Sequence, residues 1–212
     1  MQIWVGISTK DLTSLLHREI VLDAYPAGGS IKGTLPGFKT FESTGAVRIK
    51  AGSANNLPLI TLADGRKFSG DCQLVSSTGK FQIISLGRAG IKGAPRYHGT
   101  LRVAAAPGNK NTLSLSLNLS LDSYLRGVLA SEMPASYHAE ALKGQALCAR
   151  TYALHPRVPH DKDDVHVCDS YLCCQYFAGH AGSVDNRIEA AIVGTAGQIL
   201  TYQQKPILAL FS

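Results

Sequence analysis

The chain has 212 residues, 45% of them hydrophobic and 17% charged, and carries a formal net charge of +6 at pH 7. This composition is sufficient for a folded core and excludes a disordered chain of high charge and low hydrophobicity. Lysines and arginines occur singly, without the clusters interleaved with aromatic residues that nucleic-acid binding uses, so we expect no nucleic-acid partner.

The first 120 residues have the pattern of strands and turns. Residues 56–70 (NLPLITLADGRKFSG) place Asp64-Gly65 between two apolar alternations, which predicts a hairpin. A second turn is predicted at Pro107-Gly108-Asn109. It is followed by alternating leucines that predict a strand with one buried face, namely Leu113, Leu115, Leu117 and Leu119. Residues 5–25 fit either a helix or a strand.

From residue 121 the apolar period becomes helical. Residues 121–130 (LDSYLRGVLA) predict a short helix with Ser120 as its N-cap. Pro134 lacks an amide donor and pushes Met133 toward extended geometry. The sequence therefore predicts that Glu132 lies in an extended segment before the next helix.

Two further helices and a hairpin complete the predicted elements. The second helix is expected from an N-cap at Ser136 to about Leu154 and the third over residues 184–195, with Ser183 as its N-cap. Their expected inward positions are Leu142, Ala146, Ala149 and Ala153, then Ile188, Ala191 and Ile192. Residues 198–212 (QILTYQQKPILALFS) predict a C-terminal hairpin. Its last apolar run ends abruptly at Ser212, as expected of a domain cut before its end.

Glu132 has two interpretations from the residues alone. Beside Leu129, Met133 and the following helix its carboxyl group would be partly desolvated, which favours the neutral form that a general acid needs, although a helix start favours the anion. Alternatively, Glu132 is a solvated loop residue or a partner of Arg126. Spacing alone favours the second interpretation.

Several ordered motifs carry a family resemblance. Residues 124–154 (YLRGVLASEMPASYHAEALKGQALCARTYAL), residues 167–179 (VCDSYLCCQYFAG) and residues 198–212 resemble the SpoIID family of bacterial peptidoglycan lytic transglycosylases. The resemblance runs from residue 99 onward, while the strand-rich first half carries no diagnostic motif. Glu132 matches the essential glutamate of the family's Glu-Met-Pro motif.

The resemblance implies cleavage between N-acetylmuramic acid and N-acetylglucosamine in glycan strands that have lost their stem peptides, leaving 1,6-anhydro ends. Most glycosidases need two carboxyl groups. A lytic transglycosylase can use one, because the substrate's own 6-hydroxyl is the nucleophile. Glu132 would protonate the glycosidic oxygen and then accept the 6-hydroxyl proton.

The five cysteines are unevenly spaced, with Cys168, Cys173 and Cys174 inside seven residues and histidines nearby at His160, His166 and His180. An odd, clustered set does not indicate a disulfide-stapled fold, and thiolates with imidazoles suit zinc. The alternatives are buried free thiols, a disulfide from Cys168 to Cys173 or Cys174, and histidines that are simply on the surface.

The resemblance favours the metal, as a structural zinc that organises a wall of the cleft. Cys168 and Cys174 match the two cysteines of the family motif, and Cys173 stands where the family often has histidine. With these three thiolates, His166 is the expected fourth ligand and His160 the alternative.

The expected substrate-binding residues are Tyr124, Arg126, Gln175 and Tyr176, because aromatic faces and planar hydrogen-bonding groups suit sugar rings. A structural role in the core is the alternative for the buried members of such a set. Cys148 is expected in the core rather than as a nucleophile, since no paired histidine is evident.

Together these observations predict an α+β protein with a strand-rich N-terminal portion, a helical active-site region and a C-terminal β-hairpin. We expect one SpoIID-like domain over 1–212, with a strand-rich portion at 1–98 and a catalytic portion at 99–212. We expect the protein to be located outside the cytoplasmic membrane and to be at most peripherally associated with it. No leader is visible in this chain.

The expected partners are peptidoglycan glycan strands and an amidase that removes the stem peptides. The alternative function is a glycan-binding or amidase-enhancing wall protein without turnover. A zinc or redox module without a wall role is a third interpretation, which rests on the cysteines alone.

Overall fold

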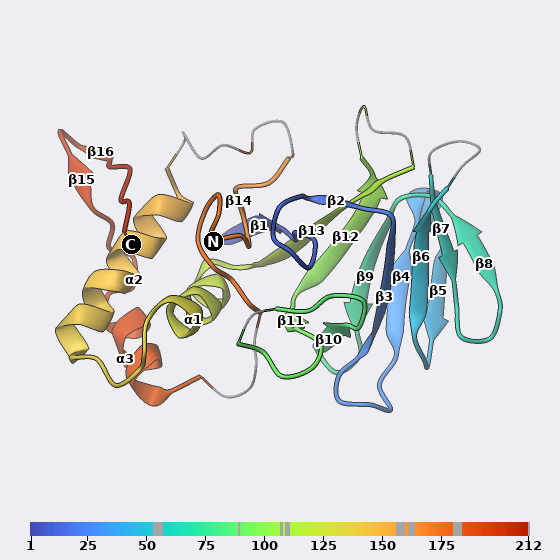
Figure 1. The fold of residues 1–212 in the computed structure, drawn as a ribbon, viewed down its shortest axis with the longest axis horizontal. Helices are drawn as coiled ribbons and strands as arrows, with labels where there is room; N and C mark the ends of the chain where they lie inside the picture. Colours follow the sequence, from blue (N-terminus) through green and yellow to red (C-terminus); the bar gives the residue numbers. More distant parts are fainter. Residues whose placement is uncertain are drawn as a thin grey trace.

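The computed structural model describes residues 1–52, 57–88, 90–106, 108, 111–155, 160, 164–179 and 184–211. The fold is α+β, as predicted. Three helices and the C-terminal hairpin gather at one end of the molecule, and most strands lie at the other (Figure 1). The N-terminus lies between these two parts, close to α1.

The larger sheet has the order β14-β1-β13-β12-β9-β4-β5, and β2 pairs with β13 beside this path. Its strands are β1 (Gln2–Gly6), β2 (Leu16–His17), β4 (Ile31–Thr34), β5 (Thr40–Ser43), β9 (Cys72–Ser76), β12 (Thr100–Ala105), β13 (Leu113–Ser120) and β14 (Val167–Cys168). β1 runs antiparallel to β13 and parallel to β14. One sheet thus joins strands from both sides of residue 98.

The second sheet has the order β11-β10-β3-β6-β7-β8. Its strands are β3 (Glu19–Ala24), β6 (Val47–Ala51), β7 (Pro58–Thr61), β8 (Lys67–Ser69), β10 (Lys80–Ile83) and β11 (Arg96–His98), and a 3₁₀ turn covers Pro36–Phe38. The ambiguous stretch 5–25 therefore contains no helix; it contributes to strands β1, β2 and β3 and to the turns between them.

Both predicted strand patterns are confirmed. β7 and β8 pair around Asp64-Gly65, where Gly65 adopts a φ of 86° that a side chain would strain. Along β13 the alternating leucines are all buried and form part of the core. β12 and β13 pair as predicted, although Pro107 and Asn109 of their turn lie outside the described residues.

The first helix is longer than predicted. Helix α1 (Leu121–Glu132) begins at Ser120, whose side chain accepts the Ser123 amide proton, and ends where Met133 is extended at φ −139° and ψ 130°. Pro134 enforces the extended Met133 as expected. The prediction for Glu132 was wrong by one residue, because Glu132 is the last residue of the helix rather than part of the extended segment.

The second helix starts later than predicted. Helix α2 (Ala139–Ala153) has His138 as its N-cap, not Ser136. The intervening residues form a turn in which the Tyr137 amide donates to the Pro134 carbonyl, and this turn delays the helix. The predicted inward face of α2 is confirmed, since Leu142, Ala146, Ala149 and Ala153 are all buried.

The third helix and the hairpin follow. Helix α3 (Asn186–Gly194) is capped by Asp185, while the predicted cap Ser183 lies outside the described residues. Its predicted inward residues Ile188, Ala191 and Ile192 are buried. Strands β15 (Thr201–Tyr202) and β16 (Lys205–Pro206) form the predicted C-terminal hairpin. In the described part of the chain, no helix has the length and apolarity needed to cross a membrane.

Candidate active site and cysteine cluster

Glu132 is presented at the exposed C-terminal end of α1. The helix stops there because Pro134 cannot continue it. The N-terminal part of α1 is anchored by buried residues, including Tyr124 and Leu125, which are fully buried. A rigid helix therefore carries a solvent-accessible carboxylate at its tip.

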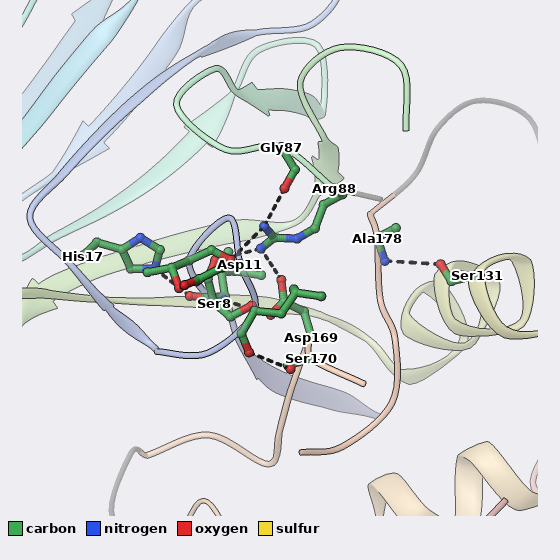
Figure 2. Close-up of polar contacts among 12 residues, drawn as sticks. Ser8, Asp11, His17, Gly87, Arg88, Ser131, Asp169, Ser170 and Ala178 are labelled. Atoms are coloured by element: carbon green, nitrogen blue, oxygen red, sulfur yellow. Dashed lines mark hydrogen bonds and ion pairs between the residues drawn. The ribbon is translucent and has the colours of Figure 1, made fainter. Parts of the chain in front are cut away.

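The segment 175–179 runs along this end of α1 and binds it at two points. The Tyr176 amide donates to Glu132 Oε1 at 2.5 Å, and the Ala178 amide donates to Ser131 Oγ at 3.2 Å. Figure 2 shows the second contact. Ser131 Oγ in turn donates to the Gly127 carbonyl at 2.7 Å. The carboxylate is thus held by a main-chain amide. The position of this donor is fixed by the backbone and does not depend on a side-chain rotamer.

Gly127 lets the segment approach α1 closely. A Cβ atom at this position would lie 2.3 Å from Cε2 of Phe177, whose ring is fully buried. Phe177 also packs against Tyr124, with ring centroids 5.3 Å apart. The missing side chain therefore brings the Tyr176 amide within reach of Glu132.

Glu132 borders a cavity of about 480 Å³ formed by the ends of α1 and α3 and the segment between α1 and α2. The described lining includes Arg126, Ala130, Glu132, Met133, Asp185 and Ile188. This combination of apolar walls with a few charged groups is typical of a ligand cleft.

The other two charged groups of the cavity already have partners. Arg126 Nε and Nη2 each donate to a carboxylate oxygen of Glu189 at 2.6 Å, so the pair is bidentate. This hydrogen bonding raises the pKa of Arg126 and lowers that of Glu189. Asp185 Oδ1 accepts the Arg187 amide proton at 2.8 Å and caps α3.

The four predicted substrate-binding residues occupy different environments. Arg126 lines the cavity, and Tyr176 contacts Glu132 through its amide. Tyr124 and Gln175 are buried, and the Tyr124 hydroxyl donates to Gln175 Oε1 at 3.0 Å. Gln175 Nε2 donates to the Ala149 carbonyl at 3.3 Å, so this pair ties the segment 175–179 to α1 and α2.

The side chain of Tyr176 contacts Tyr171, with ring centroids 5.6 Å apart and the rings nearly perpendicular. Tyr171 is 57% exposed, so an aromatic surface continues outward from the segment beside Glu132. Aromatic faces of this kind can stack on sugar rings.

A cluster of His160, Cys168, Cys173 and Cys174 lies just before this segment, with its ligand atoms all within 4.8 Å of one another. His160 Nε2 is 3.4 Å from Cys173 Sγ, and the Cys173 and Cys174 sulfurs are 4.0 Å apart. Tetrahedral zinc with bonds of about 2.3 Å to sulfur places its thiolates roughly 3.8 Å apart, so this set fits a structural zinc site.

The chemistry of the donors agrees with this geometry. Hydrogen bonding from Cys168, together with His160, lowers the pKa of Cys174 to about 4, despite burial. The same hydrogen bond and burial raise the pKa of Cys168. A thiolate is therefore favoured in the cluster before any metal is bound, and thiolate is the form that binds metal.

His166, the expected fourth ligand, does not lie in this cluster. Its Nδ1 accepts the Trp4 amide proton at 3.1 Å, on the exposed side of the chain beside β14. Because β14 pairs with β1, the residue before it is drawn toward Trp4. The alternative, His160, is the histidine that the fold brings to the three cysteines.

Two residues of α2, Cys148 and Arg150, lie outside both the cavity lining and the cysteine cluster. Cys148 is half-buried on α2, and burial raises its pKa. Arg150 is buried in the middle of α2 and donates to Thr195 Oγ1 and to the carbonyls of Ile192 and Gln198, at 3.2 Å in each case. It therefore joins α2 to the end of α3.

Comparison with known proteins agrees with this arrangement. Residues 109–202 match the model of the family described as SpoIID, Stage II sporulation protein. Residues 109–202 are therefore similar to a SpoIID domain. The matched residues contain α1 with Glu132, α2, the clustered cysteines and α3, and the resemblance predicted from the sequence is confirmed.

The curated relatives cover similar parts of the chain. Stage II sporulation protein D of Bacillus amyloliquefaciens is 40% identical over 44% of this chain, and its counterpart in Bacillus subtilis is 36% identical over the same share. An amidase enhancer of Bacillus subtilis is 35% identical over 42% of this chain and 11% of its own length. The match spans 31% of the length of the two sporulation proteins.

Sequence reasoning missed three contributors to the candidate site. Ser131 and Asp185 carry no pattern that separates them from ordinary helix-end residues, although Asp185 could have been recognised as an N-cap. Asp169 lies inside the cysteine motif, but its partner Arg88 is 81 residues away in the chain and no local signal connects them.

Proposed function

We propose that this protein is a lytic transglycosylase that cleaves peptide-free peptidoglycan glycan strands and leaves 1,6-anhydro ends, with Glu132 as its acid and base. The observation that carries the proposal is the exposed Glu132 carboxylate at the rim of the cavity, held by the Tyr176 amide. The SpoIID domain supports a role at the bacterial cell wall.

One carboxyl group is sufficient for this reaction. Hydrolytic glycosidases need a second carboxylate as nucleophile or as the base that activates water. The other acid of the cavity, Asp185, is occupied as the cap of α3 and lies 3.4 Å from Arg187 Nε. A mechanism in which the substrate's 6-hydroxyl attacks fits this distribution of groups better than hydrolysis.

In the proposed mechanism Glu132 enters as the neutral acid and protonates the glycosidic oxygen as that bond breaks. The resulting carboxylate then accepts the proton of the 6-hydroxyl as the anhydro ring closes, which restores the acid. The Tyr176 amide fixes the direction of the carboxylate and stabilises its anionic form between the two steps.

The cysteine cluster contributes to structure in this proposal. His160, Cys168, Cys173 and Cys174 would hold one zinc ion, whose contribution is a fixed tetrahedral cross-link in the loop that precedes Tyr176. The proposed cellular place is outside the cytoplasmic membrane, where glycan strands are found, with an amidase as the partner that removes stem peptides.

Exchanging the two acids of the cavity separately tests the catalytic assignment. Glu132→Gln removes the transferable proton and is expected to reduce the release of anhydro-ended fragments by roughly 10²–10⁴-fold. Asp185→Asn keeps a capping oxygen and is expected to leave most of the activity. The measurement is mass analysis of products from peptide-free glycan strands. Unchanged release by Glu132→Gln would rule out this mechanism.

A second candidate function is a glycan-binding enhancer of an amidase, without turnover. The similarity to an amidase enhancer favours it. The same digestion separates the two functions, because an enhancer would bind the strands and release no anhydro ends.

A further inference from the structure

A buried ion pair joins the two halves of the chain beside the proposed site. Arg88 Nη2 donates to Asp169 Oδ2 at 2.6 Å, and both side chains are fully buried. Figure 2 shows this pair at the centre of a polar network that links Asp169 to Ser8 and Arg88 of the strand-rich half. Arg88 follows β10, outside the SpoIID domain, whereas Asp169 lies inside it.

The rest of the network holds both partners in place. Arg88 donates to the carbonyls of Ser8, Thr9 and Gly87 at 2.8 to 3.2 Å. Asp169 Oδ1 accepts from the Ser8 amide at 2.8 Å and from the Ser8 hydroxyl at 2.5 Å. Both carboxylate oxygens of Asp169 are therefore used, and its side chain has one defined orientation.

The main chain of Asp169 is hydrogen-bonded to the segment beside Glu132, so the fixed position of Asp169 also constrains that segment. The Asp169 amide donates to the Gly6 carbonyl at 3.0 Å, and its carbonyl accepts the Phe177 amide proton at 3.2 Å. Phe177 lies between the two residues whose amides bind the end of α1, Tyr176 and Ala178. Of these three consecutive amides, the middle one thus binds Asp169 and the outer two bind the end of α1.

Such a pair is better explained by positioning than by stability. Removing two charges from water is costly, and apolar residues of similar volume often replace a buried ion pair without loss of stability. The pair fixes the orientation of both side chains. A guanidinium with four defined acceptors and a carboxylate with three donors allow few alternative arrangements.

We infer that Arg88 and Asp169 are positioning residues, through which the strand-rich half sets the segment 176–178 and so the orientation of Glu132. This inference rests on the proposed function for its effect on turnover. The coupling between the ion pair and the segment 176–178 is a property of the folded protein and does not depend on a substrate. Arg88 would thus make the first half a functional part of the SpoIID site rather than an independent unit.

The first test measures hydrogen exchange of the Tyr176, Phe177 and Ala178 amides by NMR in the full chain. Arg88→Met and Asp169→Asn each remove the ion pair, and exchange at the three amides is expected to accelerate by about tenfold or more, since the segment that carries them is no longer held in place. Exchange within α2 serves as the internal reference for a folded protein.

The double variant Arg88→Met/Asp169→Asn covers the case in which a single variant, left with one buried charge, does not fold. Ser8→Ala, which removes only a hydroxyl donor to Asp169, gives a milder version of the same change. Arg102→Met is the matched control. It breaks another arginine–aspartate pair, with Asp164, whose side chain is 84% exposed. Among the described residues, this pair makes no contact with the segment 176–178.

The second test is turnover of peptide-free glycan strands by the same folded variants. Misdirection of Glu132 is expected to lower kcat on the order of 10²-fold with KM within about twofold, because the binding cavity keeps its lining. A general loss of structure would instead lower the amount of folded enzyme and change both tests together with the α2 reference.

The outcomes are distinguishable from those of the proposed function. If the wild-type chain releases no anhydro ends, the proposed function fails, while the exchange measurement still decides whether the pair positions the segment. If the wild-type chain is active and the variants show unchanged exchange at the three amides and an unchanged kcat, the positioning role is overturned.

Discussion

The presentation of Glu132 depends on a few atoms. Its Oε1 accepts the Tyr176 amide proton at 2.5 Å, and the neighbouring Ser131 binds the Ala178 amide. Both contacts come from main-chain donors, whose positions follow from the path of the chain. The accuracy with which Glu132 points into the cavity is therefore set by the backbone of the segment 175–179 rather than by other side chains.

His17 supports a pH-dependent prediction at the residue scale. This imidazole is buried, its Nε2 lies 2.7 Å from the Ile7 carbonyl, and burial lowers its pKa, with a smaller contribution from Arg88 and opposition from the Ile7 carbonyl and Asp169. The unfolded chain therefore binds more protons at His17 than the folded chain does below about pH 6.5. Stability from this group is complete above that pH and is lost as the pH falls through it.

The expected result is a steeper fall of the free energy of unfolding in the wild type than in His17→Gln between about pH 7 and about pH 5.5, by at most about 1.4 kcal/mol per pH unit. Glutamine can still donate to the Ile7 carbonyl but does not titrate in this range. Urea unfolding at several pH values measures the difference. Parallel curves for the two proteins would mean that His17 titrates alike in both states.

Among the elements, the loop from β14 to the segment 175–179 has the most closely spaced constraints. The three cysteines of the cluster, Asp169 and the amides bound to α1 all lie between Cys168 and Ala178. If zinc occupies the cluster, its removal should loosen this loop more than any of the helices, because the helices have their own buried faces.

This gives a prediction for the metal. Protein purified without added metal is expected to contain about one zinc per chain, and Cys168→Ser should lose it. A loss of about 2 kcal/mol in the free energy of unfolding is expected, which lowers Tm by roughly 4–8 °C because each kcal/mol shifts Tm by about 2–4 °C in a chain of this size. Elemental analysis and thermal unfolding are the measurements.

Cys148→Ser is the matched control, because Cys148 is half-buried on α2 and lies outside the cluster. It should retain the zinc and most of the Tm. Wild-type protein without zinc, and with a Cys168–Cys174 disulfide, would favour the alternative interpretation of the cysteines.

The elements themselves could largely be predicted, since local patterns determine them. The alternation in Leu113–Leu119, the Asp64-Gly65 turn and the Ser120 cap act over a few residues, and each is found in the structure. Helix starts were less accurate where two neighbouring residues could cap. Ser136 has a suitable hydroxyl, but the turn from Pro134 to Tyr137 leaves the cap to His138.

The candidate site could be predicted only in part, because its remaining contacts are long-range. The motifs pointed to Glu132 and to the three cysteines that the structure brings together with His160. The choice of His160 over His166 depends on β14 pairing with β1, and the burial of Tyr124 and Gln175 depends on how α1 packs against the segment 175–179. A single sequence contains no local signal for either.

At the scale of the whole molecule, the two halves share one sheet. β1 lies between β13 and β14, and β12 pairs with β9, so strands on both sides of residue 98 form common hydrogen bonds. Ile3, Val5 and Ile7 are fully buried in the same core as α1. The division of the chain at residue 98 therefore does not coincide with a gap in the core.

A fragment of residues 99–212 is accordingly expected not to fold on its own. It would expose the apolar edge of β13 that β1 covers and would lack Arg88, the partner of Asp169. Circular dichroism should show no cooperative thermal transition, in contrast to the full chain, and adding residues 1–98 as a separate peptide should restore one. A cooperative and active fragment would show that the second half is an independent domain.

The position of β1 also has a consequence for the order of folding. Its partners are β13 and β14, and the farthest pair, Gly6 with Cys168, is separated by most of the chain. During synthesis β1 therefore lacks its partner strands until residues translated much later leave the ribosome. Until then it has an unpaired edge and three large apolar side chains. Contacts between residues so far apart in the sequence slow folding and prolong the exposure of aggregation-prone intermediates. β1 therefore completes its pairing only after residue 168 has been synthesised, and the site beside β14 is completed no earlier.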